Sequence, residues 1–180
     1  MQSGKFVWLG LKNTVIRLNI FFIQFTSVEK GVNPMKTVVL ISCTKSKRQV
    51  NSCTARLMYD TSDLFRKSLA YAEVISKDIF VISAKYGLVP LNQVINHYDE
   101  TLKGKRKAEK DAWGRRVAEQ ISELFDVKNT EFVILSGRDY YAPLQPYLPH
   151  IKLPLGNLTL FKRPPALELL TKEAKEAKRV

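Results

Sequence analysis

Val38-Val39-Leu40-Ile41-Ser42 is an apolar run that ends in serine and leads directly into the polar stretch Cys43-Thr44-Lys45-Ser46-Lys47. The pattern returns twice: Phe80-Val81-Ile82-Ser83 precedes Ala84-Lys85-Tyr86-Gly87-Leu88, and Phe132-Val133-Ile134-Leu135-Ser136 precedes Gly137-Arg138-Asp139-Tyr140-Tyr141. Segments with helical periodicity separate the runs, which predicts parallel strands in one sheet. The carboxyl ends of such strands meet at one edge, where open α/β sheets bind their ligands. We therefore expect three distant stretches to form one site.

The predicted fold class is α/β, a three-layer α/β/α sandwich with a mostly parallel central sheet. Strands are expected over about residues 37–42, 78–83 and 131–136, with residues 151–153 as a fourth, edge strand. Amphipathic helices are expected over residues 64–75 and around Trp113 to Phe125, and a last helix over residues 166–178 after two prolines. Residues 43–58 and 84–102 are predicted to be a long polar loop and a mostly irregular segment.

Composition points to one globular domain with a polyanionic partner. The chain has 180 residues, of which 45% are hydrophobic, enough to bury a core. Its formal net charge of +12 favours nucleic acid or a phosphorylated ligand, although a lysine-rich soluble surface explains the same charge.

Residues 1–34 differ from the remainder and are treated as an N-terminal extension to a single domain over residues 35–180. Val15 to Val28 is apolar but interrupted by polar residues, too short for a confident membrane span, and no signal-peptide cleavage pattern follows. Met35 is an alternative start, since Met35-Lys36-Thr37 leads straight into the first strand. If the segment is expressed, an extra strand or a poorly packed extension is expected. The protein is expected in the cytoplasm, without a membrane partner.

Metal and cofactor sites are not expected. The two cysteines, Cys43 and Cys53, have neither zinc-ribbon nor CxxC spacing, and His97 and His150 are the only histidines. No phosphate-binding P-loop, dinucleotide fingerprint or nucleophile elbow occurs.

The first candidate site segment follows the first strand. Backbone N–H groups after Ser42, with Lys45 and Lys47, suit a phosphate, although a solvated basic turn is equally consistent with these residues. Cys43 is a candidate nucleophile if a neighbouring lysine activates it. Farther along, Tyr59 can point at the site, and Ser62 either binds the ligand or, more simply, caps the following helix.

The second candidate segment follows Ser83. Lys85, at the end of a buried strand, is expected to be partly desolvated and to act as base or nucleophile. Tyr86 can stack on a base, and Gly87 allows a positive φ or a close ligand approach. A tight turn with an exposed lysine is the plainer alternative.

Two further segments complete the expected site. Tyr98 and Asp99 offer a ligand contact and a general base. Ser136 and Gly137 suit an anion at the third strand end, and Tyr140 suits closure over a planar ring, although packing under the proline-rich segment also explains the tyrosine.

A basic stretch suits contacts with a phosphate backbone, although it also reads as an ordinary exposed helix end. Its residues are Lys103, Lys105, Arg106, Lys107, Arg115 and Arg116.

Four motifs together resemble a bacterial, archaeal and phage family of uncharacterised cytosolic domains. They are Ile41 to Lys47 (CxKxK), Leu57 to Phe65 (YxxSxLF), Ser83 to Leu88 (SAKYGL) and Tyr98 to Leu102 (YDxTL). The resemblance spans about residues 37–155 and implies a compact α/β domain. The chain is also distantly similar to the catalytic domain of archaeosine synthase, which modifies a deazaguanine base in tRNA, through the spacing of Cys43 and Lys47. In outline it resembles the DNA-binding peroxide-stress YaaA family.

The function expected from the sequence is an enzyme acting on a nucleobase or nucleotide, free or as a modified base within nucleic acid. Lys45 and Lys47 would hold phosphate, Tyr86 and Tyr140 would sandwich the base, and Lys85 or Asp99 would move protons. Two alternatives stay open: a non-catalytic DNA- or RNA-binding protein of stress or phage function, and a nucleotide sensor without turnover.

Overall fold

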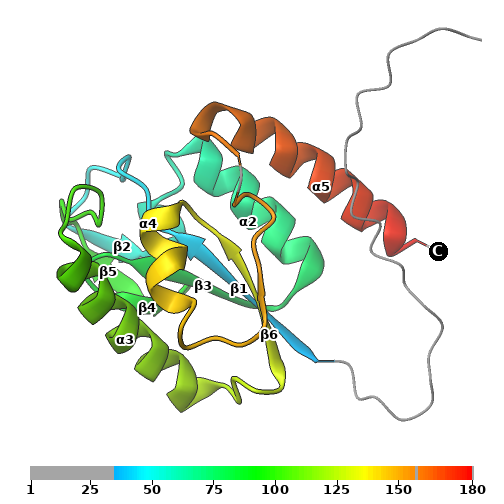
Figure 1. The fold of residues 1–180 in the computed structure, drawn as a ribbon. Coiled ribbons are helices and arrows are strands. Elements are labelled where there is room, and N and C mark those ends of the chain that lie inside the picture. The colour runs from blue at the N-terminus through cyan, green and yellow to red at the C-terminus, as the bar shows by residue number, and fades with distance from the viewer. Residues whose placement is uncertain (1–34, 157, 180) are drawn as a thin grey trace, which may run out of the picture. The chain divides into compact units, whose positions relative to one another are not determined.

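A computed structural model of the chain describes residues 35–156 and 158–179. The expectations for residues 1–34 lie outside the described part. Within it, a five-stranded sheet has the order β4-β3-β1-β6-β7 (Figure 1).

The central strands are those predicted from the apolar runs. They are β1 (Lys36–Ser42), β3 (Asp78–Ser83) and β6 (Thr130–Leu135), and β1 pairs in parallel with both others. Leu40 lies opposite Phe80 on one side and Ile134 on the other. The edge strand β7 (Ile151–Lys152) is also parallel, whereas β4 (Gly87–Pro90) runs antiparallel to β3. The sheet is therefore mixed and mostly parallel, as expected for an α/β fold.

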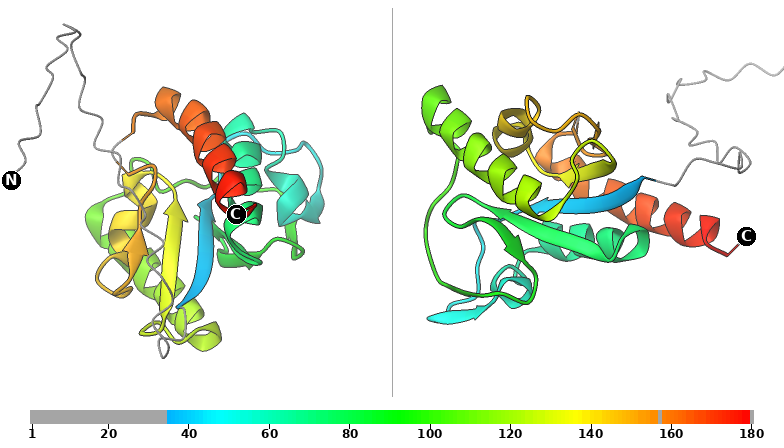
Figure 2. Two further views of the ribbon diagram at one scale, coloured as in Figure 1. Left: turned by 90° about the vertical axis from the view of Figure 1, so that its right-hand side faces the viewer. Right: turned by 90° about the horizontal axis from the view of Figure 1, so that it is seen from below.

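Helices cover the sheet because its central strands are apolar on both faces. Val38 to Ile41 are each at most 1% exposed. The helix α2 (Asp63–Ile75) packs against β1 and α5 (Arg163–Ala177), whereas α3 (Lys107–Leu124) packs against β4 and the 3₁₀ turn η1 (Ala142–Leu144). Figure 2 shows these two groups of helices from two further directions.

The direction of the connections reverses at β1. The chain leaves β1 through α2 to reach β3 on one side, and it later returns through α3 to β6 on the other side. The carboxyl ends of strands at such a reversal diverge and leave room for a ligand. The short helix α4 (Arg138–Tyr141) follows β6 at this edge.

The loop predicted over residues 43–58 is partly wrong, and the mostly irregular segment predicted over residues 84–102 also contains short strands. Residues 43–58 contain β2 (Ser52–Thr54) and the one-turn helix α1 (Ala55–Met58), and residues 84–102 contain β4 and β5 (Val94–Asn96). β2 and β5 pair with each other as a separate antiparallel sheet. Three- and four-residue strands have too short an apolar pattern to be recognised, and their pairing is decided by non-local contacts.

Other local predictions are confirmed. The Ser62 hydroxyl accepts from the backbone N–H of Phe65 at 3.3 Å and caps α2, and Phe65 lies in the core. The last helix begins at Arg163, earlier than expected, because Pro164 and Pro165 occupy its first turn, where a missing N–H costs nothing. The short turn η2 (Leu160–Lys162) precedes it.

Within the described residues, no helix combines the length and apolar character that crossing a bilayer requires.

Candidate functional site

The predicted strand-end residues form a compact cluster of polar and aromatic side chains. We call it the strand-end cluster and define it as Cys43, Lys47, Tyr59, Ser83, Tyr98 and Tyr140. All six are buried, with exposed fractions between 0% and 9%. They come from the ends of β1 and β3, the turn after α1, the segment after β5, and α4. Residues almost a hundred positions apart are thus brought together at the carboxyl edge of the sheet.

Three hydroxyl groups form a hydrogen-bonded chain in this cluster. The Tyr98 hydroxyl lies 2.8 Å from Ser83 Oγ and 2.7 Å from the Tyr59 hydroxyl. Ser83 Oγ also accepts from the backbone N–H groups of Lys85 (3.2 Å) and Tyr86 (3.1 Å). Because these bonds occupy its lone pairs, Ser83 donates its own hydrogen to Tyr98, and Tyr98 donates to Tyr59. The Tyr59 hydrogen is then left for an acceptor outside the three.

A second contact joins the strand ends of β1 and β6 through side chains. Cys43 Sγ lies 3.3 Å from the Tyr140 hydroxyl, which also accepts from the backbone N–H of Leu102 at 3.5 Å. The ring of Tyr140 meets Trp113 edge-on at 5.5 Å between centroids, and Trp113 Nε1 donates to the carbonyl of Ser83 at 2.9 Å. Trp113 of α3 thereby ties the two halves of the cluster together.

The phenols of the cluster are held in their neutral form. Burial raises the pKa of Tyr59, Tyr98 and Tyr140 well above the usual range, and the neighbouring Cys43 adds to each shift. At neutral pH all three therefore carry a hydrogen to donate.

Lys47 is the lysine that the fold buries. Only 6% of it is exposed, and Nζ lies 4.4 Å from the centroid of the Tyr98 ring. No carboxylate of the described residues forms an ion pair with it. Burying an ammonium group without a counter-charge is costly. This position therefore favours a role for Lys47 in binding an anion or in reacting with a ligand.

The expectation of a partly desolvated Lys85 is wrong. Lys85 is exposed, because the turn after β3 carries its side chain out of the core. Its Nζ lies 5.3 Å from the Tyr86 ring centroid and 6.0 Å from that of Tyr98. Tyr86 is half-buried and meets Tyr98 edge-on at 5.4 Å. Lys85 and Tyr86 thus form the outer side of the cluster.

Gly87 adopts the positive φ that its motif suggested, at 75°. A Cβ there would meet Gln120 Oε1 at 2.1 Å, and that oxygen accepts from the backbone N–H of Leu88 at 2.8 Å. The glycine therefore allows α3 to approach the turn that presents Lys85, which is a packing role.

Other predicted residues are not part of the buried cluster. Asp99 is exposed. Lys45 is exposed whereas Lys47 is buried, so the two lysines do not face the same surroundings as expected for one shared phosphate. Ser42 and Gly137 lie at the carboxyl ends of β1 and β6. Ser136 is buried and donates to the carbonyl of Gly137 at 3.2 Å. Of the two rings expected to sandwich a base, Tyr86 is half-buried and Tyr140 is buried with its ring edge-on to Trp113.

The predicted nucleic-acid-binding residues are all exposed, but acidic neighbours offset several of them. Lys105 and Arg106 pair with Glu109, and Lys107 pairs with Asp111. Arg116 donates to the carbonyl of Lys85 at 3.4 Å, which places α3 beside the outer side of the cluster. No described residues pair with Lys103 or Arg115.

Leu102 contacts the cluster at Tyr140 and was not predicted as a site residue. It is 1% exposed, whereas residues 99–101 and 103–108 are exposed. A single buried leucine thus anchors an otherwise solvated segment next to Tyr140. Its sequence signal, one apolar residue in a charged stretch, is too weak to be recognised.

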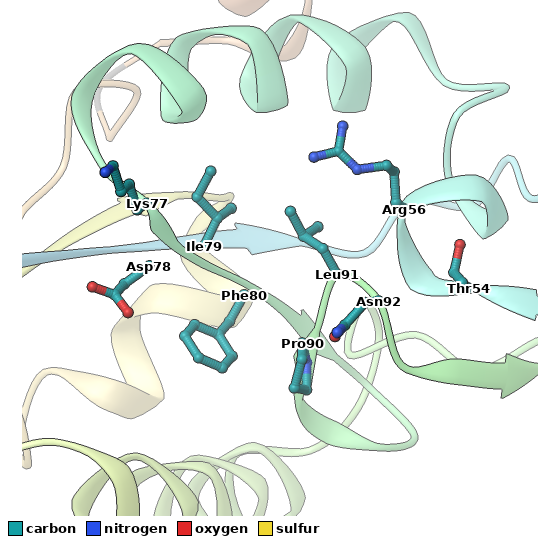
Figure 3. A pocket seen from close by; sticks show the side chains of 9 residues that line it. All are labelled: Thr54, Arg56, Lys77, Asp78, Ile79, Phe80, Pro90, Leu91 and Asn92. Atoms are coloured by element: carbon teal, nitrogen blue, oxygen red, sulfur yellow. The ribbon is translucent and has the colours of Figure 1, made fainter.

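A larger cavity of about 430 Å³ lies away from the cluster. Its lining comes from the start of β3, the end of β4 with the following turn, and α1 (Figure 3). Its charged groups are largely satisfied, since Arg56 pairs with Glu73 and Asp78 with Lys36. None of the predicted site residues lines it.

No group of three or more potential metal ligands occurs among the described residues. The donor set at the cluster, an amine, a thiol and hydroxyls, is suited to a polar organic ligand.

A model of a protein family described as a family of unknown function (DUF6884) matches residues 38–168. No curated protein and no solved structure is significantly similar to the chain.

Proposed function

We propose a function for this chain, which belongs to the family of unknown function DUF6884, from the chemistry of its strand-end cluster. The protein is an enzyme that acts on a nucleobase or nucleotide, free or as a modified base within nucleic acid. The observation that carries the proposal is Lys47, a buried amine on the face of Tyr98 with no carboxylate partner among the described residues, in the same cluster as the Cys43 thiol.

The groups present suit a planar, polar ring. Tyr86 offers a half-buried aromatic surface, and stacking on such rings is worth about 1–3 kcal/mol per base. Exposed Lys85 and buried Lys47 both approach the ring of Tyr98 and supply positive charge to an anionic or electron-rich ligand. The neutral phenols supply hydrogen-bond donors, and Cys43 and Lys47 are the candidate reacting groups. Lys85 and Asp99 serve proton transfer at the outer side.

A ligand reaches these groups by displacing the segment that Leu102 anchors. Leu102 is the buried anchor of this segment: its backbone N–H lies 3.5 Å from the Tyr140 hydroxyl, and the flanking residues are solvated. Closure after binding would exclude water from the cluster.

Three finer features belong to the same proposal. The architecture is a three-layer α/β/α sandwich, which the burial of β1 on both faces supports. The family motifs and the distant similarity to archaeosine synthase and the YaaA family are supported by the meeting of Cys43, Lys47 and tyrosines in one cluster. A cytoplasmic location is supported by both cysteines being free thiols.

A second candidate function is DNA or RNA binding without catalysis. It is favoured by Arg116, which joins the basic surface of α3 to the Lys85 turn, and by exposed Arg115. Phosphate contacts of this kind give affinity that falls steeply with salt.

The test uses the full chain in a thermal-shift screen at two salt concentrations, followed by product analysis of the hits. Nucleobases, nucleosides, nucleotides and short single- and double-stranded oligonucleotides are the probes. Lys47→Met removes the amine and keeps the volume, and Lys45→Met is the matched exposed control. We expect stabilisation by one base or nucleotide, lost in Lys47→Met and kept in Lys45→Met.

Each other outcome decides between the candidates. Binding that depends on Lys47 without any product identifies a nucleotide sensor. Sequence-blind binding of oligonucleotides that high salt abolishes, and that Lys47→Met and Lys85→Ala leave intact, identifies the nucleic-acid-binding protein. Either result rejects the enzyme.

A further inference from the structure

Arg163, the first residue of α5, holds its guanidinium group at the carboxyl edge of the sheet. Nε donates to the carbonyl of Leu158 at 3.1 Å, which orients the group. A Cβ on Gly137, directly after β6, would lie 3.3 Å from Nη1 and 3.7 Å from Nη2. The guanidinium therefore rests against the backbone at Gly137, where only glycine leaves it full room.

The two Nη groups of Arg163 have no protein acceptor within the described residues. Arg163 is half-buried, and no carboxylate of that part of the chain forms an ion pair with it. A guanidinium cannot lose its charge at any relevant pH, so these half-buried N–H groups favour an anionic acceptor that the described residues do not supply.

Three residues with hydroxyl groups line a narrow cavity with Arg163. They are Ser42 at the end of β1, Thr44 two residues later and Ser68 of α2, and the remaining lining is apolar. The Thr44 hydroxyl donates to the carbonyl of Ser46 at 2.9 Å, which leaves Ser42 as the donor at the strand end. The room inside is about 10 Å³, which admits a water molecule or an oxygen of an anion resting at the mouth, and excludes a ring.

The narrow cavity lies at the end of β1, and one of its lining residues directly precedes a residue of the strand-end cluster. Ser42 lines the cavity and Cys43, the next residue, belongs to the cluster. Side chains of consecutive residues in extended chain point to opposite faces. A ligand lying across the end of β1 would thus reach Arg163 with one part and the Cys43 and Tyr98 side with another.

We infer that Arg163, with Ser42, binds the phosphate group of the ligand. The substrate is then a nucleoside phosphate, free or as a nucleotide unit of a chain, and a free base or nucleoside lacks this contact. A guanidinium fork matches two phosphate oxygens, and such charge-assisted bonds are about twice as strong as neutral ones. Arg163 thereby replaces Lys45 and Lys47 as the expected phosphate ligand. Lys45 is exposed, and Lys47 lies against the ring of Tyr98. The inference rests on the proposed function for the identity of the base.

Calorimetric titration of the full chain tests the inference with inorganic phosphate, the common ribonucleosides and their 5′-monophosphates. We expect the monophosphate to bind more tightly than its nucleoside, and Arg163→Gln to lower monophosphate affinity by about tenfold or more while leaving the nucleoside unchanged. Lys162→Gln removes one charge from the adjacent exposed residue and serves as the matched control.

Gly137→Ala provides an independent variant that keeps every charge. Its methyl group would push against Nη1, so phosphate-dependent affinity should fall while nucleoside binding stays the same. This variant decides the question if Arg163→Gln loses the Leu158 contact and fails to fold. Equal loss in Lys162→Gln and Arg163→Gln, or full phosphate-dependent affinity in either Arg163→Gln or Gly137→Ala, would overturn the inference.

Failure of the proposed function gives a different result. If inorganic phosphate binds in an Arg163-dependent manner and no nucleoside or nucleotide binds better, the anion site stands and the nucleotide substrate is rejected. If nucleosides and monophosphates bind equally well in a Lys47-dependent manner, the base site stands and the Arg163 inference is rejected.

Discussion

The phenol oxygens of Tyr59 and Tyr98 lie 2.7 Å apart inside the protein, although 39 positions separate the two residues. Tyr98 also bonds to Ser83, so its hydroxyl is the middle of a chain of three. The chain connects the turn before α2, the end of β3 and the segment after β5. It therefore holds together the loops that form the candidate site.

Removing the central hydroxyl should destabilise the fold. In Tyr98→Phe, both Ser83 and Tyr59 lose a buried partner, and we expect the free energy of unfolding to fall by about 1–3 kcal/mol. Urea unfolding measures the change. Tyr147→Phe, at a residue 41% exposed, is the control and should stay within about 0.5 kcal/mol of the wild type. Equal effects of the two substitutions would show that the hydroxyl chain does not stabilise the structure.

Stability should decline at alkaline pH. Burial raises the pKa of Tyr59, Tyr98 and Tyr140, whereas the same phenols ionise at about pH 10 in the unfolded chain. The unfolded state then binds fewer protons than the folded state, so the free energy of unfolding falls as pH rises above about 10, and below that pH this contribution is fully present. Each buried phenol should contribute about 1.4 kcal/mol per pH unit. Urea unfolding at several pH values should give a shallower decline for Tyr98→Phe than for the wild type, and parallel curves would contradict this account.

Two glycines with positive φ allow the stability cost of backbone strain to be measured separately from the cost of a steric contact. Gly87 has φ 75° and faces Gln120, whereas Gly104 has φ 82° and open space around its missing Cβ. We expect Gly104→Ala to cost about 1 kcal/mol from backbone strain alone. Gly87→Ala should cost about 1–3 kcal/mol more, because the methyl group displaces the Gln120 oxygen that Leu88 uses. In a Gln120→Ala background the costs of the two substitutions should converge, and a persistent difference would refute the assigned contact.

Leu102 should control access to Cys43. Cys43 is 8% exposed, and the backbone N–H of buried Leu102 donates to the hydroxyl of the neighbouring Tyr140. In a Cys53→Ser background, Leu102→Ala should cost about 2–4 kcal/mol and accelerate the reaction of Cys43 with an aromatic disulfide reagent. Leu160→Ala, at a leucine 60% exposed, is the control and should leave the rate unchanged. An unchanged rate in Leu102→Ala would mean that Cys43 is reached by another route.

Local sequence was sufficient for the main elements of the fold. Continuous apolar runs bounded by polar loops predicted β1, β3 and β6, because strands buried on both faces consist mainly of apolar residues. The Ser62 cap and the apolar stripe of α3 were predicted as well, since both depend on residues within a few positions of one another. β2, β4 and β5 were missed because so short a strand is defined by its partner.

The sequence by itself determined which loops lie at the carboxyl edge, because parallel strands separated by helices leave no other arrangement. Which of their side chains are buried was decided only by the tertiary structure. Lys45, Lys47 and Lys85 are alike as residue types, yet only Lys47 is buried, against a tyrosine supplied by a distant segment. Arg163 likewise comes to the end of β6 only because α5 returns to pack against α2. Burial and counter-charge depend on contacts across the whole fold, and these determine the chemistry of the site.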